Sequence, residues 1–263
     1  MIVLNKVIGK SEILLRPVLQ HVPAFRRYSE KKKYAAELAF KASVVEEIVD
    51  WYLGRIKELY GTPCPTEAQR IIVGSDRDNA ILTYAKLHQE PIYLSTLECD
   101  PNTFAGCKLL DIGSSAIPSA LAFQDMELYC LEPLLPDQLR IGYPFWAYEK
   151  RVRFIYGFSE KMPFPDDFFD AAISVNALDH VDDFSVTAQE IKRVTKPGAK
   201  LRFHLHFHKA TTTEPIELTD EIVSKAFGWC PDFRKVSEFR ERNGIQLNPD
   251  LPDEVHTIWS NFE

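Results

Sequence analysis

The sequence predicts an α/β fold with a mostly parallel sheet behind an amino-terminal helical extension. Before residue 106, apolar residues recur at helical spacing. From Gly106 onward, short apolar runs of strand length alternate with helical or loop segments. The first of these runs leads into KLLDIGSSAIP at 108–118, which delivers an acidic residue and a glycine into a tight turn. Such a turn lets backbone approach a ligand closely.

Residues 1–105 are predicted to form the helical extension. Between Tyr34 and Tyr60 the apolar residues fall at spacings of three and four, which predicts one amphipathic helix ended by Gly61-Thr62-Pro63. The basic run at 31–33 is predicted to be a solvated helix start. The apolar stripe consists of Leu38, Ala42, Val45, Ile48, Val49, Tyr52, Ile56 and Leu59.

Residues 106–263 are predicted to form the ligand-binding domain. Helical periodicity at 183–195 is followed by Lys196-Pro197-Gly198, a stop signal that leads into a strand. A second helix is expected at 218–227. Together the strands predict a Rossmann-like, doubly wound, seven-stranded sheet. They are expected at 108–112, 128–131, 152–156, 171–175, 200–207, 233–240 and 255–262.

The composition is that of an ordinary soluble domain. The 263 residues are 45% hydrophobic and 26% charged, enough to bury a full core. Neither a run of about 18 apolar residues nor an uncharged signal segment is present, so we expect a cytoplasmic protein without a membrane partner. A net charge of −7 argues against nucleic acid as a partner. Five cysteines without a C-x-x-C pair argue against disulfides and thiolate zinc. The oligomeric state is not predicted.

Candidate site residues follow the predicted strands, because ligands bind beyond the carboxyl ends of parallel strands. Asp111 and Gly113 follow the first strand and Glu132 the second. Segments 158–160 and 176–180 follow the third and fourth. Glu132 lies about 20 residues beyond Asp111, the distance at which an acidic side chain accepts hydrogen bonds from ribose hydroxyls. These positions indicate a nucleoside site.

Five sequence pieces occur together in a known order. They are LLDIG at 109–113, LEP at 131–133, GFSEKMPFPDDFFDAAIS at 157–174, VNALDHVDD at 175–183 and EIKRVTKPGAKL at 190–201. Through these five pieces, the region 106–208 resembles the class I S-adenosylmethionine-dependent methyltransferases, in particular their type 11 domain. The resemblance implies S-adenosylmethionine as cofactor and a methyl-transfer activity.

Carried over position by position, the resemblance gives five residues a role in cofactor binding. Asp111 and Gly113 would lie beneath the methionine part, with the backbone at Ser114 close to it. Glu132 would bind the ribose hydroxyls, and Pro133 would pack near the adenine. The strand-end residue Asn176 is a further cofactor candidate.

Two positions depart from the family pattern. Phe158 stands where the family usually has an aspartate facing the adenine amino group, so backbone groups near Ser159, or stacking on adenine, would replace that contact. Ser114-Ser115-Ala116 stands where further glycines are usual. A methyltransferase-like binding or scaffold protein without catalysis is therefore the alternative function.

Histidines are the candidate catalytic residues. His180 is either a proton acceptor or substrate contact, or a loop-packing residue. His206 or His208 is the second choice. Together with His204 they alternate along the predicted fifth strand, so all three project from one face. In a regular strand, however, His204 and His208 would be about 13 Å apart, and no metal is expected.

The acceptor is predicted to be a small molecule. The sequence Asn-Ala-Leu-Asp-His at 176–180, a histidine-bearing fifth strand and Glu214-Pro215 resemble methyltransferases of bacterial saccharide and secondary-metabolite pathways. A sugar or glycan hydroxyl or amine is the favoured acceptor. Tyr28, Tyr34 and Trp51 of the extension would either line the acceptor pocket or pack as helix core.

Overall fold

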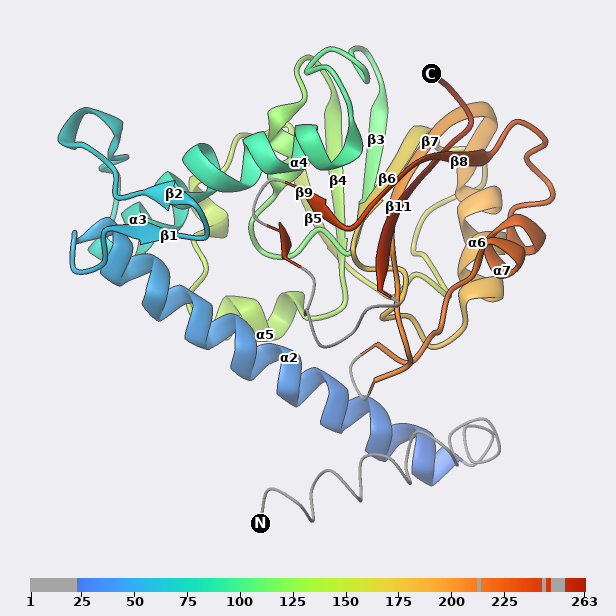
Figure 1. Cartoon of the computed structure of the whole chain (residues 1–263), viewed down its shortest axis with the longest axis horizontal. Helices are drawn as coiled ribbons and strands as arrows, with labels where there is room; N and C mark the ends of the chain where they lie inside the picture. The colour runs from blue at the N-terminus through green and yellow to red at the C-terminus, as the bar shows by residue number, and fades with distance from the viewer. Residues whose placement is uncertain (1–22, 212–213, 243–244, 247–253) are drawn as a thin grey trace.

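The computed structural model describes residues 23–211, 214–242, 245–246 and 254–263, with the side chains of 23–31 and 241–246 left aside. Its centre is a seven-stranded sheet of order β5-β4-β3-β6-β7-β11-β8 (Figure 1). In that order the strands are β5 (Val152–Tyr156), β4 (Glu127–Glu132), β3 (Lys108–Ile112), β6 (Phe169–Val175), β7 (Thr195–Phe207), β11 (Val255–Ser260) and β8 (Arg234–Phe239).

The strand directions confirm the predicted doubly wound, mostly parallel sheet. Strands β5, β4, β3, β6 and β7 pair in parallel, and β11 pairs antiparallel with both β7 and β8. Strand β3 has β4 on one side and β6 on the other, so the strand order reverses at β3. A reversal of this kind opens a crevice beyond the carboxyl ends of the strands.

Both faces of the sheet are covered by helices. Successive β3 side chains point to opposite faces, so alternate residues of β3 pack in two separate cores. On one face, Leu110 and Ile112 pack with helices α6 (Phe184–Val194) and α7 (Asp220–Ala226). On the other, Leu109 packs with Tyr93 and Leu97 of α4 (Glu90–Leu97). Asp183 caps α6 by accepting a hydrogen bond from the Val186 N–H at 3.0 Å. Strand β7 begins directly after α6, so Lys196-Pro197-Gly198 lies inside the strand and does not precede it.

The remaining elements are short, apart from one long helix. Helix α2 (Pro23–Tyr52) runs below the sheet in Figure 1. No helix among the described residues is long and apolar enough to cross a membrane. The others are β1 (Glu58–Leu59), β2 (Thr62–Pro63), η1 (Glu67–Gln69), α3 (Asp76–Tyr84), η2 (Ala85–Gln89), η3 (Ser119–Ala122), α5 (Leu135–Arg140), η4 (Phe145–Ala147), β9 (Glu241–Arg242) and β10 (Ile245–Gln246).

The predicted end of the long helix is wrong, because Gly54 stops it. Gly54 has a φ of 74°, which glycine adopts without steric cost. The Gly54 N–H donates to the Trp51 carbonyl at 3.0 Å, and the Arg55 N–H donates to the Asp50 carbonyl at 2.8 Å. These two bonds form a Schellman cap. The chain beyond it forms the β1–β2 hairpin in place of two further helical turns.

The amino-terminal helices share a core with residues beyond 106. Val45, Ile48 and Trp51 pack with α3 and with Ala116 and Ile117 of the turn after β3. Trp51 is therefore core, while Tyr34 lines a pocket and the side chain of Tyr28 lies outside the described residues. This packing holds one face of α2 over the carboxyl edge of the sheet.

Candidate functional site

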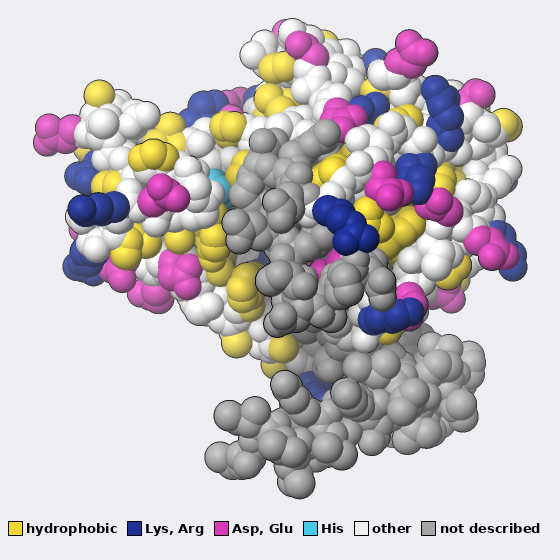
Figure 2. All heavy atoms as spheres, viewed as in Figure 1, with side chains coloured by type: hydrophobic (Ala, Val, Ile, Leu, Met, Phe, Trp, Pro, Cys, Tyr) yellow, Lys and Arg dark blue, Asp and Glu magenta, His cyan; other side chains and the backbone are white. Residues whose placement is uncertain are grey.

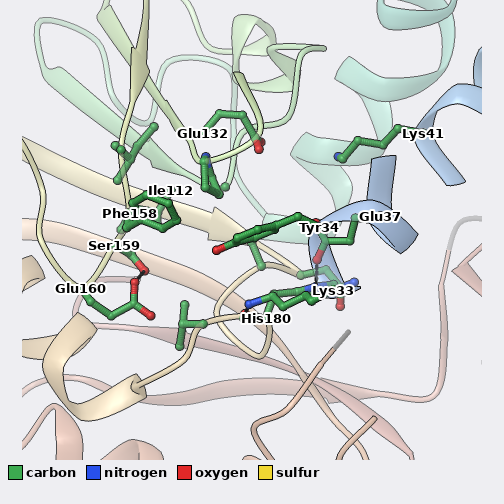
Figure 3. Close-up of a pocket in the computed structure, with 17 residues that line it drawn as sticks. Lys33, Tyr34, Glu37, Lys41, Ile112, Glu132, Phe158, Ser159, Glu160 and His180 are labelled. Carbon is green, nitrogen blue, oxygen red and sulfur yellow. Dashed lines mark hydrogen bonds and ion pairs between the residues drawn. The ribbon is translucent and has the colours of Figure 1, made fainter. Parts of the chain in front are cut away.

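A pocket lies at the carboxyl edge of the sheet, between the strand ends and α2 (Figure 3). Its sheet side is formed by strand-end residues that the sequence singled out, and its other side by one face of α2. In Figure 3, Tyr34 points from α2 across the pocket toward Phe158. The sheet side contains Gly113, Glu132, Pro133, Phe158, Ser159 and Asn176, and the helix side contains Lys33, Tyr34, Glu37 and Lys41.

The turn after β3, residues 113–115 (the β3 turn), is held in an unusual backbone conformation. Gly113 has a φ of 74° and Ser115 a φ of 60°. A Cβ placed on Gly113 would lie 2.3 Å from the Cβ of Ala177, in the segment after β6. Glycine is therefore required at 113 both for the backbone angle and for close packing of two strand ends. Ser115 shows that the chain tolerates a non-glycine residue in the second left-handed position.

Glu132 stabilises the β3 turn from the neighbouring strand. Its carboxylate accepts the Ser115 N–H at 2.9 Å and the Leu134 N–H at 2.8 Å. The side chain is 4% exposed. On the other side of the turn, Lys41 Nζ donates to the Ser115 hydroxyl at 3.1 Å. The turn is thus fixed by charged groups from β4 and from α2.

Asp111 and Ser114 are both buried and do not line the pocket; Ser114 belongs to the β3 turn, and Asp111 lies beneath it. The Tyr93 hydroxyl donates to Asp111 Oδ1 at 2.5 Å, while Oδ2 has no hydrogen-bond partner among the described residues. Burial, together with the charge of Glu132, raises the pKa of Asp111 to about 7, against the lowering effect of the Tyr93 hydrogen bond. Asp111 thus supports the turn from below and is poised to change charge near neutral pH.

Aromatic rings form one wall of the pocket. Phe158 is 39% exposed, with its ring centroid 6.2 Å from that of Tyr34 and 5.9 Å from that of Tyr156. The Ser159 hydroxyl is turned away toward Thr187 Oγ1 at 3.1 Å. Asn176 has a φ of 50° and is exposed. An exposed aromatic face beside polar backbone suits a flat, polar ring system.

His180 stands on the opposite side of the pocket. Its Nδ1 lies 3.0 Å from Glu37 Oε1 on α2, and its Nε2 lies 3.6 Å from Glu214 Oε1. Burial works against the charged imidazole, but the Glu37 hydrogen bond and the nearby carboxylates raise the pKa of His180 above its ordinary value. The ring is therefore oriented by a carboxylate that comes from the amino-terminal helix.

Lys33 is not the solvated residue that the sequence predicted. It is 3% exposed, donates to the backbone carbonyl of His180, and lies 3.6 Å from Asp182 Oδ1. The carbonyl and the carboxylate compensate the desolvation of its ammonium group. Lys33, Glu37 and Lys41 are spaced four residues apart on one face of α2. This four-residue spacing of charged residues was the signal in the sequence for a helix face that lines the pocket. The sequence analysis did not use it.

The fifth-strand histidines lie behind the pocket and do not line it. Strand β7 ends at Phe207, so His208 leaves the regular strand and its ring centroid lies 4.6 Å from that of His206. The regular spacing assumed from the sequence is wrong at this point. His204 faces another partner, with its Nε2 3.0 Å from His256 Nδ1 on β11.

His208 forms a buried pair with Asp179. Its Nε2 lies 3.1 Å from Asp179 Oδ2, and its Nδ1 lies 2.8 Å from the Lys209 carbonyl oxygen. Burial opposes protonation, but these two hydrogen bonds and the charge of Glu214 raise the pKa of His208 to about 9. Both His206 and His208 are thus separated from the pocket by the segment that carries His180.

The central part of the chain is similar to known methyltransferases. A family model described as a methyltransferase domain matches residues 138–203, from α5 to β7. The chain is 33% identical over 136 residues to an uncharacterized methyltransferase, YcgJ, of Bacillus subtilis, covering 51% of this chain and 50% of that protein. The crystal structure of YcgJ aligns with a TM-score of 0.46 and 18% identity, covering 66% of this chain and 97% of that one.

Two further relatives have named activities. Demethylmenaquinone methyltransferase of Mycobacterium marinum is 30% identical over 96 residues, 36% of this chain and 40% of that protein. Ajmaline N-methyltransferase of Rauvolfia serpentina is 31% identical over 138 residues, 48% of this chain and 44% of that protein. The chain spans half or less of the length of these curated relatives.

Proposed function

We propose that this chain, which is related to the class I S-adenosylmethionine-dependent methyltransferases through its methyltransferase domain, transfers the methyl group of S-adenosylmethionine to a small-molecule acceptor. The observation that carries the proposal is the pocket itself. It joins the β3 turn, Glu132 and Phe158 on one side to a polar face of α2 on the other. A donor and an acceptor can therefore meet in one pocket.

The residues present fit the cofactor. Glu132 already accepts two backbone N–H groups, and a carboxylate has about four lone-pair sites, so two remain for the ribose hydroxyls. Phe158 and Pro133 offer apolar surface to the adenine. Oδ2 of Asp111, beneath Gly113 and Ser114, is buried and has no hydrogen-bond partner among the described residues, which favours a cationic group above the turn, such as the methionine ammonium. Backbone groups near Ser159 and Asn176 would complete the site.

Methyl transfer needs little from the protein beyond alignment and a proton acceptor. When bound, the cofactor supplies an activated methyl group on its sulfonium. Positioning of the acceptor nucleophile can lower the barrier substantially. His180 would take the proton of an acceptor hydroxyl or amine at Nε2, while Glu37 holds Nδ1. His206 and His208, which lie behind His180, would act on it only indirectly.

A sugar or glycan hydroxyl or amine is the acceptor we favour. The side of the pocket nearest α2, where we place the acceptor, combines two carboxylates and one ammonium group, those of Glu37, Glu160 and Lys41, with the aromatic ring of Tyr34. Hydroxyl-rich rings are bound by polar groups at their edges and by apolar or aromatic surface on their faces. Figure 2 shows lysine and arginine interspersed with aspartate and glutamate over the described surface of one face, which supports a small molecule over a polyanion.

The decisive experiment is cofactor binding followed by an acceptor screen. Mass spectrometry of the purified chain and calorimetry with S-adenosylmethionine should show one bound cofactor with micromolar affinity. No binding up to millimolar concentration would overturn the proposal and favour a scaffold without catalysis. Transfer of labelled methyl should then be compared among saccharide, quinone and alkaloid acceptors. Labelling of a quinone or alkaloid alone would reject the saccharide.

Replacing His180 should separate catalysis from cofactor binding. His180→Ala removes the proposed proton acceptor, so we expect methyl transfer to slow by about 100-fold or more while cofactor affinity stays within about twofold. His180→Gln, which retains polar atoms near Glu37, should also be slow. Single-turnover rates and calorimetry measure the two quantities separately. Intact turnover in both variants would show that the acceptor needs no base at this position.

A further inference from the structure

A second polar site lies behind His180, outside the pocket. Asp179, His206, His208 and Glu214 (the carboxylate–histidine site) each offer one ligand atom, and the four atoms lie within 4.8 Å of one another. We propose that this site binds a first-row divalent metal ion of the zinc class. The proposal does not depend on methyl transfer, because metal binding is measurable without a methyl donor.

Three segments bring the four side chains together. Asp179 follows β6, His206 and His208 stand at the end of β7, and Glu214 belongs to the segment beyond it. The side chains of Asp179 and His208 are 1% and 2% exposed, and that of His206 is 14% exposed. The side chain of Glu214 is 24% exposed. The site is therefore mostly buried, unlike an ordinary cluster of acidic groups on a protein surface.

Unpartnered polar atoms are the second observation. Asp179 Oδ1 and His206 Nε2 are buried without a hydrogen-bond partner among the described residues, although Glu254 Oε2 lies 3.5 Å from His206 Nε2. Buried polar atoms nearly always have partners, so two such atoms in one cluster call for a ligand. A metal cation can be coordinated by both the carboxylate oxygen and the imidazole nitrogen.

The tautomer of His208 is suited to a metal. Its Nδ1 faces the Lys209 carbonyl oxygen at 2.8 Å, so Nδ1 carries a proton and Nε2 remains a lone-pair donor once the ring is neutral. Metal-binding histidines usually donate their second ring N–H to a carbonyl or carboxylate in this way. A proton shared between His208 and Asp179 would satisfy only Asp179 Oδ2. Asp179 Oδ1 and His206 Nε2 would still have no hydrogen-bond partner among the described residues.

The donor set selects the class of metal. Two imidazole nitrogens and two carboxylate oxygens suit zinc and the neighbouring divalent ions, whereas magnesium and calcium prefer oxygen alone. With metal–ligand bonds of about 2.0 to 2.1 Å, neighbouring ligands of a tetrahedral ion lie about 3.3 Å apart. The 3.1 Å between His208 Nε2 and Asp179 Oδ2 is already close to that distance.

A bound ion would also affect the acceptor side of the pocket. Glu214 Oε2 lies 4.0 Å from His208 Nε2, while Glu214 Oε1 lies 3.6 Å from His180 Nε2. One carboxylate thus connects the carboxylate–histidine site to the pocket. The ion would hold Glu214, and with it the segment after β7, in a fixed position beside His180.

Metal binding to the tag-free, chelator-treated full chain tests the proposal. Calorimetry with Zn²⁺ and elemental analysis after dialysis should give one ion per chain, and Zn²⁺ should raise the thermal unfolding midpoint. Co²⁺ should give the visible absorption bands of a four-coordinate site. His206→Gln and Glu214→Gln should each weaken Zn²⁺ binding by at least about tenfold, since even outer partners of metal ligands cost that much.

Matched controls keep the test specific. Glu217→Gln changes a carboxylate on the same segment that pairs with Lys209 at the surface, and His88→Gln changes a distant buried histidine. Both should bind Zn²⁺ as the parent chain does. If His206→Gln does not fold, the partly exposed Glu214 provides the deciding variant. Absence of Zn²⁺ binding in the parent chain, or equal affinity in parent and ligand variants, would overturn the proposal.

Discussion

The β3 turn and the carboxylate–histidine site lie at the same carboxyl edge of the sheet, yet their polar groups are satisfied differently. At the β3 turn, both oxygens of Glu132 accept backbone N–H groups, so the turn is organised without a ligand. In the carboxylate–histidine site, side chains face one another, and Asp179 Oδ1 and His206 Nε2 have no hydrogen-bond partner among the described residues. The first site is therefore preorganised by the protein, whereas the second needs a proton or a cation to become stable.

The largest effect should come from Glu132→Ala, which removes the group that organises the β3 turn. Two buried N–H groups, of Ser115 and Leu134, would lose their acceptor, which costs about 1–3 kcal/mol each. Cofactor affinity should fall by roughly tenfold to a hundredfold or more, as expected for a lost charged hydrogen bond. Urea unfolding and calorimetry measure the two effects.

The control for Glu132 is Glu127→Ala on the same strand. Glu127 pairs with Arg153 at the surface, where about half of each side chain is exposed, so its loss should cost at most about 1 kcal/mol. Cofactor affinity should be unaffected. Unchanged affinity in Glu132→Ala would contradict the assignment of the ribose site.

Asp111→Asn tests whether the turn rests on a buried titrating group. The folded chain holds the pKa of Asp111 at about 7, above the ordinary 3.8, through burial and the charge of Glu132. Its contribution to stability is therefore complete below about pH 4 and is lost as the pH rises through 7. Relative to the parent chain, Asp111→Asn should gain up to about 4 kcal/mol between pH 4 and pH 8.

Urea unfolding of both chains at several pH values measures this difference. Asp232→Asn, which changes an exposed residue, provides the background for the comparison. A stability difference that does not change with pH would show that Asp111 does not titrate in this range.

Gly113→Ala tests the rigidity of the β3 turn. The new Cβ would meet the Ala177 Cβ at 2.3 Å, and the φ of 74° would be strained for alanine. We expect a loss of about 2–4 kcal/mol, of which the backbone angle accounts for about 1–2. The double variant with Ala177→Gly should regain the stability lost to the clash, but not the part lost to the strained φ at residue 113. Full stability in the single variant would show that the turn can move away from β6.

The smallest effect is expected for Lys33→Met, which weakens the contact between α2 and residues 180–182. This segment lies between the pocket and the carboxylate–histidine site. The variant keeps the apolar stem but loses the hydrogen bond to the His180 carbonyl and the ion pair with Asp182. A loss of about 1–2 kcal/mol is expected, because the partly exposed Asp182 can be rehydrated. Acceptor KM should rise more than cofactor Kd. Lys86→Met, at an exposed pair on another helix, should change neither constant.

Much of the sheet was predictable because its signals are local. Apolar runs bounded by turn residues located six of the seven strands of the main sheet to within two residues, whereas β7 begins five residues earlier than predicted. Asp183 marked the start of α6. Strand ends of a parallel sheet meet at one edge, so the sequence also indicated that Gly113, Glu132 and Phe158 would gather there. The end of α2 was predicted wrongly, although the sequence contained a signal for it, since Gly54 is a usual helix C-cap residue.

By itself, the sequence determined the fold class, the similarity to methyltransferases and the sheet side of the pocket, because these depend on hydrophobic periodicity and on residues next to one another in the chain. Only the tertiary structure decided which residues face that side. Lys33 and Glu37 reach His180 across more than 140 positions of sequence. His208 pairs with Asp179, which lies 29 positions earlier in the sequence. Long-range packing, which no local pattern encodes, sets these contacts.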